Sequence, residues 1–276
     1  MKIKKLYSYS SKRQIWRLLP TETDKLVIEE RDTGSKEVFF ACIDIKTGKK
    51  VFKNFQLEEK FWIGIEKIYK DLIFFDKFRK PDMPGHLGII TFDITGRKIL
   101  WETDKYIFQS ILNDELYCYQ ERFDTRNYFK LNYLTGDVVE DLGQNVEEIN
   151  SLRTESIQAN NLNDYYFTRQ FNPGHEDSET VINHLNGIKT SFLISGKIEY
   201  INLPGLLLYN FHEIAPSGGE MKNIFKAVDI EAGKVIFEEE LNTAVKAFIH
   251  DSFFVKNNLL FLLKDKTKFI TCSINK

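Results

Sequence analysis

The sequence has few cysteines, and their spacing excludes two classes of small domain. Its three cysteines are far apart, and no two of them form a C-x-x-C pair. A disulfide scaffold or a zinc ribbon needs closely spaced cysteines in larger number. Each cysteine instead lies in an apolar run typical of a strand, where a small side chain is usually buried. We therefore predict buried structural thiols at Cys42, Cys118 and Cys272.

Long hydrophobic runs are also absent. A secretory signal peptide needs an apolar stretch of about 7–15 residues after its basic start. Polar residues interrupt any such stretch after the opening MKIKK. A transmembrane helix needs about 18 consecutive apolar residues, and the sequence contains no run of that length. From these two absences we expect a cytoplasmic protein without membrane insertion.

Neither sign of charge is in excess. The chain has 38 basic and 40 acidic side chains, which give a formal net charge of -2. A dedicated DNA-binding protein usually has a basic surplus, because neutralised phosphates supply much of its affinity. We therefore expect no nucleic-acid partner.

The short motifs that identify common catalytic sites are missing. There is no GxSxG elbow, no P-loop and no GxGxxG. The five histidines form no HxH, HExxH or HxxxH spacing. The sequence therefore predicts no catalytic residue, no cofactor and no metal site.

Apolar and aromatic residues, by contrast, are plentiful. Apolar side chains make up 42% of the 276 residues and aromatic ones 14%, which is enough for a sizeable core and excludes a disordered chain. No linker or composition shift divides the sequence, so we expect a single domain over residues 1–276. Helical periodicity is weak. Even Glu58–Lys70, which can be drawn as a helix, is predicted as a strand from its β-branched and aromatic content.

One phrase recurs along the chain. It begins with Asp or Asn, continues to a Gly, and ends in apolar or aromatic residues. The clear copies are Asp44–Phe52, Asp93–Trp101, Asn132–Glu140 and Asp229–Phe237, and weaker ones are Ser8–Trp16 and Asn183–Ser191. Such a phrase predicts a hairpin, because the Asp or Asn side chain can bond to the backbone ahead of it and the Gly accepts a positive φ.

The spacing of the phrase indicates the architecture. Successive copies lie about 44 residues apart, which matches a four-stranded blade of a β-propeller. Six short apolar runs form a parallel series, and we interpret them as the second strand of each blade. These runs are Leu26–Ile28, Leu72–Phe75, Leu116–Tyr119, Tyr165–Phe167, Leu206–Tyr209 and Leu259–Leu263.

We therefore predict an all-β fold, a six-bladed β-propeller of four-stranded antiparallel blades, with five or seven blades as alternatives. The N-terminal strand has no blade before it, and the C-terminal strands lack a final hairpin partner. We predict that they share one blade, with one outermost strand from the N-terminus and three strands from the C-terminus. Such pairing closes the ring and removes exposed sheet edges.

The recurring phrase resembles the repeats of quinoprotein-like (PQQ-repeat) β-propellers. That family includes quinone-dependent dehydrogenases and scaffold proteins of envelope assembly, so the resemblance implies a fold and not an activity. The enzymes are typically larger, eight-bladed and exported, often with adjacent cysteines. This chain lacks the Cys-Cys pair, and none of the family's catalytic residues can be carried over to it. The resemblance thus implies an uncharacterised, non-enzymatic branch.

Charged residues and histidines follow the predicted second strands. In a propeller these loops emerge on one face around the central channel, where loops vary over a rigid scaffold. One interpretation is a solvated rim; the other is a ligand-binding face. For the second, the candidate residues are Arg31, Arg79, His86, Arg122, Arg169, His175 and His212.

Three functional hypotheses remain open from the sequence. The first is a non-enzymatic interaction module that binds a protein or a small polar ligand on the loop face. The second is an enzyme, a hydrolase or lyase, with its site at the channel mouth. The third is a structural protein without a ligand. Histidine and carboxylate side chains that converge would favour an enzyme, and a dispersed, shallow face would favour a binder.

Overall fold

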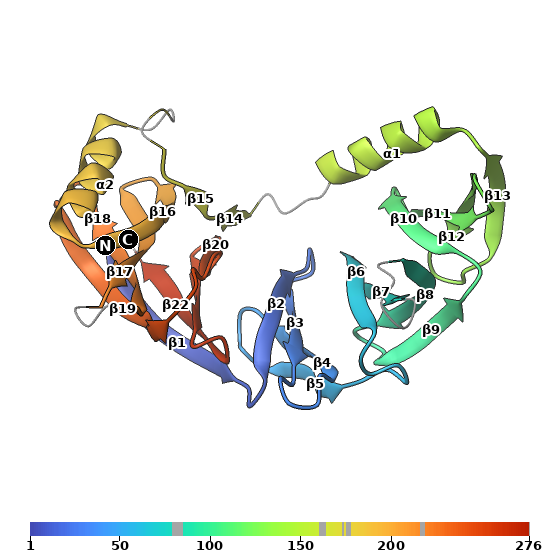
Figure 1. The fold of residues 1–276 in the computed structure, drawn as a ribbon, viewed down its shortest axis with the longest axis horizontal. Helices are drawn as coiled ribbons and strands as arrows, with labels where there is room; N and C mark the ends of the chain where they lie inside the picture. Colours follow the sequence, from blue (N-terminus) through green and yellow to red (C-terminus); the bar gives the residue numbers. More distant parts are fainter. Residues whose placement is uncertain (79–84, 160–163, 173, 175–177, 216–218, 276) are drawn as a thin grey trace. The chain divides into compact units, whose positions relative to one another are not determined.

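The computed structural model describes residues 1–78, 85–159, 164–172, 174, 178–215 and 219–275. Antiparallel strands dominate these residues and form five sheets within them (Figure 1). The chain separates into two compact units. The middle unit comprises Arg13–Leu162, and the terminal unit comprises Met1–Lys12 together with Asn163–Lys276. The prediction of an all-β chain built from repeated antiparallel sheets is confirmed.

The middle unit contains three sheets, each of four strands paired in sequence order. The first contains β2 (Gln14–Pro20), β3 (Lys25–Arg31), β4 (Val38–Asp44) and β5 (Lys50–Phe55). The second contains β6 (Ile63–Tyr69), β7 (Leu72–Phe78), β8 (His86–Asp93) and β9 (Lys98–Thr103). The third contains β10 (Ile107–Leu112), β11 (Glu115–Glu121), β12 (Arg126–Asn132) and β13 (Val138–Gly143).

Apolar residues hold these three sheets together. One cluster joins the first and second sheets, where the rings of Phe40 and Phe75 lie 4.7 Å apart. Another joins the second and third sheets around Phe74 and Leu116. A helix, α1 (Val146–Gln158), follows the third sheet and buries Ile149 against it. Burial of such large apolar side chains is the main stabilising contribution to sheets packed face to face.

The terminal unit contains two sheets and a helix. One sheet has the order β1-β22-β21-β20-β14, and the other has the order β15-β16-β17-β18-β19. The first consists of β1 (Lys2–Ser10), β14 (Tyr165–Phe167), β20 (Phe253–Lys256), β21 (Leu259–Lys264) and β22 (Lys268–Asn275). The second consists of β15 (Arg169–Gln170), β16 (Ile194–Leu203), β17 (Leu206–Ile214), β18 (Met221–Asp229) and β19 (Lys234–Val245), and the helix is α2 (Glu179–Ser191).

The two ends of the chain meet in one sheet. Strand β1 pairs antiparallel with β22, from Lys2 opposite Asn275 to Ser10 opposite Lys268. It is the outermost strand beside three C-terminal strands, so the predicted sharing of one sheet is confirmed. The ring of Tyr9 stacks on Phe269 with centroids 5.3 Å apart.

The recurring phrase forms the predicted hairpins at its four clear copies, which join β4 to β5, β8 to β9, β12 to β13 and β18 to β19. In the first copy, Asp44 accepts hydrogen bonds from the backbone N–H and the hydroxyl of Thr47, and Gly48 has φ 69°. The second copy corrects one detail. Its left-handed residue is Arg97, at φ 55°, and not the preceding Gly96, because the turn places that conformation on the fifth residue.

The described residues between 146 and 191 form helices and short edge strands where a fourth blade was expected, so a count of six blades is not confirmed. The described part of the chain has five sheets, and this stretch contains α1, α2 and the short edge strands β14 and β15. The hairpin predicted at Asn183–Ser191 is wrong, because these residues lie inside α2. The run Tyr165–Phe167 forms the edge strand β14. The weak copy at Ser8–Trp16 is not a hairpin either, since β1 and β2 belong to different sheets.

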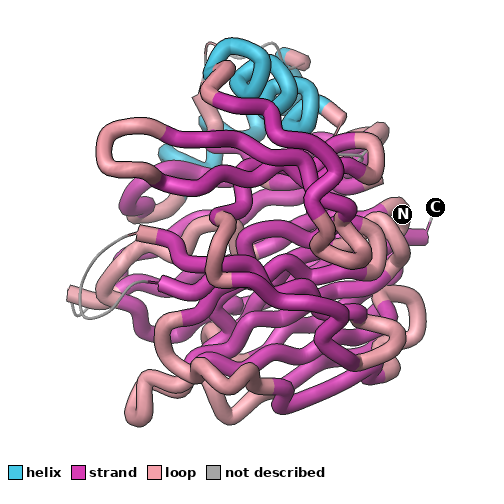
Figure 2. Tube along the Cα trace, turned by 90° about the vertical axis from the view of Figure 1, so that its right-hand side faces the viewer, coloured by secondary structure: helices cyan, strands magenta, loops and turns pink. Residues whose placement is uncertain are grey.

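Helices are a minor part of the structure, as the cyan segments in Figure 2 show. Each of the two helices in the described residues has 13 residues. Among those residues, no helix combines the length and the apolar character needed to cross a bilayer.

Candidate functional site

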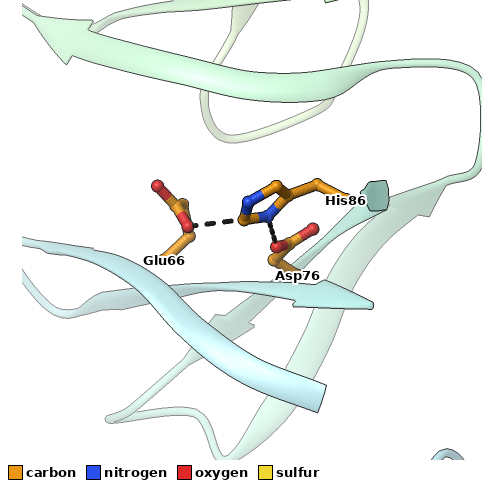
Figure 3. Close-up of side chains that lie close together, drawn as sticks. All are labelled: Glu66, Asp76 and His86. Atoms are coloured by element: carbon orange, nitrogen blue, oxygen red, sulfur yellow. Dashed lines mark hydrogen bonds and ion pairs between the residues drawn. The ribbon is translucent and has the colours of Figure 1, made fainter. Parts of the chain in front are cut away.

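A cluster of chemically active side chains lies in the second sheet of the middle unit. It consists of Glu66 from β6, Asp76 from β7 and His86 from β8, three strands that are neighbours in the sheet. One ligand atom from each residue lies within 4.8 Å of the other two. Figure 3 shows the three side chains pointing toward one another. We call this group the Glu–Asp–His cluster.

Irregular strand pairing brings these residues together. The register of β6 against β7 shifts between Ile65 and Lys67, so Glu66 is the extra residue. The register of β7 against β8 shifts between Phe75 and Lys77, on either side of Asp76. A bulge of this kind redirects a side chain out of the regular alternation, and bulges are common beside functional sites.

Asp76 is the buried member of the cluster. Its side chain is 2% exposed, and its Oδ2 atom accepts a hydrogen bond from Nδ1 of His86. Its other oxygen, Oδ1, has no hydrogen-bond partner among the residues that the structure describes. A buried polar atom left without a partner costs roughly 1–3 kcal/mol, and more when the group is charged. The fold therefore holds one acceptor atom unsatisfied at this position.

The other two members face solvent on one side. The side chain of His86 is 40% exposed and that of Glu66 is 37% exposed, with 3.9 Å between Nδ1 and Oε2. The ring of Phe78 packs beside the imidazole of His86, with 5.5 Å between the two ring centroids. The cluster is thus open to a ligand on the side of His86 and Glu66, and closed at Asp76.

A comparison with the first sheet shows a different arrangement there. Glu30 and Asp76 each lie four residues after the leucine that begins the apolar run of its strand. Glu30 is buried, but it binds Nη1 of Arg13 at 3.2 Å. Its neighbour Glu29, which is fully buried, binds Arg17 and Arg31 at 2.6 and 2.9 Å.

Buried carboxylates are normally paired with cations, as these two are. Within the described residues, the ion-pair partner of Asp76 is His86, and no arginine or lysine binds it. Two carboxyl groups and one imidazole leave the cluster acidic. The chemistry of the cluster therefore suits the binding of a cation.

Arg31, one of the predicted ligand-binding residues, has a structural role. Its guanidinium donates to Glu29 from both Nε and Nη2, and it stacks on the ring of Trp16 at 4.7 Å. Arg31 is thus paired with a carboxylate and an aromatic ring of its own sheet. Arg169 likewise lies over the ring of Tyr200, at 4.7 Å, in the sheet that contains β15 and β16.

Arg122 lies at the tip of the β11–β12 hairpin and is exposed. It lines an open hollow of about 580 Å³ together with Phe123, Arg126 and Val146. Charges of both signs surround this hollow, since Glu121 and Asp124 also line it. The hollow therefore shows no preference for a ligand of one sign.

His212 is not a loop histidine, which corrects the prediction. It lies inside β17, is 3% exposed, and its Nε2 accepts a hydrogen bond from the backbone N–H of Ile249. Burial, followed by the nearby charge of His250, lowers the pKa of His212 below 6.5. Its surroundings are those of a core residue.

The contacts of the described residues thus do not bring the predicted ligand-binding residues together in one site. Each predicted residue that the structure describes makes its contacts within its own unit. Among them, only His86 belongs to the Glu–Asp–His cluster. Arg79 and His175 lie outside the described residues. Sequence reasoning missed Glu66 and Asp76. One signal for Asp76 was available, namely an acidic residue at the end of the apolar run LIFF.

The chain was also compared with known proteins. A family model with the description "Domain of unknown function (DUF4905)" matches residues 19–101, which include the whole Glu–Asp–His cluster. No curated protein matches the chain.

Solved structures give weak similarities. "Structure of Dos1 propeller" is 12% identical, with a TM-score of 0.31 over 95% of this chain and 68% of that one. A eukaryotic initiation factor is 8% identical, with a TM-score of 0.33 over 81% and 54%. The Pyrococcus horikoshii acylaminoacyl peptidase is 10% identical, with a TM-score of 0.32 over 91% and 35%. This chain spans about half of the second structure and about a third of the third.

Proposed function

We propose that this chain is a non-enzymatic binding module and that the Glu–Asp–His cluster is its binding site for a positively charged group. The observation that carries the proposal is the unpartnered Oδ1 of Asp76, buried beside an open acidic cluster. A ligand cation would supply the partner that this oxygen lacks. The cation would form an ion pair with Asp76, as Arg13 does with Glu30.

The rigid sheet supports this role. Each member of the cluster is on a strand, and sites on strands are held more precisely than sites on loops. The strands therefore hold the backbone of the site in place before a ligand arrives, which lowers the entropic cost of binding.

The fold that we propose for the module is a β-propeller of the quinoprotein-like kind. The consecutive pairing order of the strands, the repeated Asp–Gly hairpins and the pairing of β1 with β22 support it. We also propose a cytoplasmic location for this module.

Catalysis is the alternative, and one observation favours it. A histidine that donates Nδ1–H to a buried carboxylate has the orientation of a general base. In nucleophilic catalysis by a Ser–His or Cys–His pair, such a base also needs a hydroxyl or thiol at its other nitrogen. Among the described residues, no such contact to Nε2 of His86 is seen. The three thiols are buried, and burial raises the pKa of Cys42 to about 12 and that of Cys272 to about 11. Binding is therefore the better-supported function.

The proposal is tested by thermal unfolding with a panel of cations. The panel contains divalent metal salts, N-acetyl-lysine amide and N-acetyl-arginine amide. A ligand at 100 times its Kd adds about 2.7 kcal/mol to the stability of the folded state. We expect at least one cation to raise the Tm of the wild type and not that of Asp76→Asn. If every cation acts equally on both proteins, the cluster is not the binding site.

A further inference from the structure

We propose that the Glu–Asp–His cluster is a site for a divalent transition metal ion of the zinc type, with Glu66, Asp76 and His86 as its ligands. This proposal rests on the proposed function and names the class of cation that the site takes. Two independent observations carry it: three ligand atoms within 4.8 Å of one another, and the unpartnered oxygen of a carboxylate that is 2% exposed.

The set of donor atoms selects the ion. Imidazole nitrogen suits Zn²⁺ and its neighbours among the transition metals, whereas Ca²⁺ and Mg²⁺ prefer ligands that are all oxygen. Zn²⁺ binds both imidazole nitrogen and carboxylate oxygen, the two kinds of donor atom in this cluster. We therefore expect Zn²⁺ to bind much more tightly than Ca²⁺ or Mg²⁺.

The distances are close to those that an ion needs. Ligand bonds of about 2.1 Å in a tetrahedral arrangement place neighbouring ligand atoms roughly 3.4 Å apart. Nδ1 of His86 and Oε2 of Glu66 are separated by 3.9 Å. The half-exposed side chains of Glu66 and His86 must rotate to close this difference and to separate Nδ1 from Oδ2 of Asp76.

The contact between His86 and Asp76 also changes in a defined way. Nδ1 of His86 now forms a hydrogen bond with Oδ2 of Asp76. A metal ion needs the lone pair of that nitrogen, so the neutral ring binds it as the tautomer whose proton is on Nε2. The ion replaces this hydrogen bond, so Nδ1 and Oδ2 must move apart to become two of its ligands.

Three protein ligands leave a coordination position open. Structural zinc sites normally have four protein ligands, whereas sites with three hold a water or an exchangeable group at the fourth position. The exposed sides of Glu66 and His86 place that position toward solvent. A partner that offers an imidazole, carboxylate or small anion would bind there, which connects the metal to the role of a binding module.

The experiment is isothermal titration of chelator-treated, full-length protein with ZnCl₂, CaCl₂ and MgCl₂. The variants are Glu66→Gln, Asp76→Asn and His86→Gln. The matched control is His250→Gln, because Nδ1 of His250 also binds a buried carboxylate, Glu199 at 2.9 Å. That pair lacks a third ligand within the described residues.

We expect one Zn²⁺ per chain in the wild type and in His250→Gln. Each of the three cluster variants should weaken Zn²⁺ binding by at least about tenfold, since even indirect supports of a metal site cost 10–100-fold. Circular dichroism of each variant establishes that it is folded, and Glu66→Gln, at a half-exposed position, keeps the test valid if Asp76→Asn fails to fold.

Two outcomes would overturn the inference. One is that Zn²⁺ binds the wild type no better than Ca²⁺ or Mg²⁺, and the other is that the cluster variants bind Zn²⁺ as the control does. If the lysine or arginine amide still stabilises the wild type and not Asp76→Asn, the cation-binding function survives and only the choice of metal fails.

Discussion

Buried titratable residues determine how this protein responds to pH. Burial lowers the pKa of His212 and of His184, both in the terminal unit. Because the folded state resists protonation of these rings, the unfolded state binds more protons once the pH falls toward 6.5. The free energy of unfolding should therefore decrease as the pH falls through that value, and the loss is complete below the lowered pKa.

His212→Gln isolates this effect. The variant keeps an acceptor for the N–H of Ile249 and cannot titrate, so its stability should change less between pH about 7.5 and about 5.5 than that of the wild type. Urea denaturation at both values measures the difference. Burial raises the pKa of Glu199, which acts in the opposite direction, because its ionised form costs stability as the pH rises. An equal pH dependence in His212→Gln and the wild type would contradict the account.

Single residues also decide how α1 is attached to the middle unit. Its Ile149 is 1% exposed and packs in a cluster with Tyr117 and Tyr128, and the hydroxyl of Ser156 donates to the carbonyl of Ile111 at 2.7 Å. The same helix exposes 67% of Ile157. The element is thus fixed by one face only.

Replacement of these two isoleucines tests the docking of the helix. Ile149→Ala should lower the free energy of unfolding by about 2–4 kcal/mol, because it leaves a cavity in a packed cluster. Ile157→Ala should change it by less than about 0.5 kcal/mol. Denaturant unfolding of both variants gives the values. Equal losses would mean that α1 is not held by the face that contains Ile149.

The elements that the sequence predicted are those with a local signal. The hairpins at Asp44 and Asp229 follow from an Asp side chain and a Gly placed within one turn, and the apolar runs of β3, β7 and β11 follow from their composition. The two helices escaped prediction because each buries only two residues, such as Val181 and Leu185 in α2, which leaves little apolar periodicity. Their N-caps, Asn145 and Ser178, were the available signals.

The candidate site could be predicted only in part. His86 was found because it follows a predicted second strand. Glu66 and Asp76 were missed because their proximity depends on two register shifts between neighbouring strands. Sequence spacing does not reveal a bulge in strand pairing, so contacts made across such a bulge need coordinates.

At the scale of the whole molecule, the terminal unit depends on both ends of the chain. Strand β1 covers the edge of β22, and Tyr9, 4% exposed, stacks on Phe269. Leu6, at the register shift of the same strand, is 47% exposed. The β1–β22 edge of this sheet therefore forms only after residues separated by most of the sequence have met, which is a slow step in folding.

A pair of substitutions tests this closure. Tyr9→Ala should cost about 3 kcal/mol of unfolding free energy and should increase hydrogen exchange in β22. Leu6→Ala should cost less than about 0.5 kcal/mol and leave exchange unchanged. Hydrogen exchange followed by mass spectrometry provides the measurement. If exchange in β22 is the same in both variants, β1 does not secure the two ends.

The central claim is that the carboxylate of Asp76 is held for a ligand, whereas that of Glu29 is held for the fold. The most direct test is urea unfolding of Asp76→Asn and Glu29→Gln in buffer that contains a chelator. Asp76→Asn should be as stable as the wild type or up to about 2 kcal/mol more stable, because binding sites are often held at a cost in stability. Glu29→Gln should lose about 1.5–3 kcal/mol, since two arginines lose a charged partner. If Asp76→Asn loses as much stability as Glu29→Gln, the carboxylate of Asp76 is structural and the account is wrong.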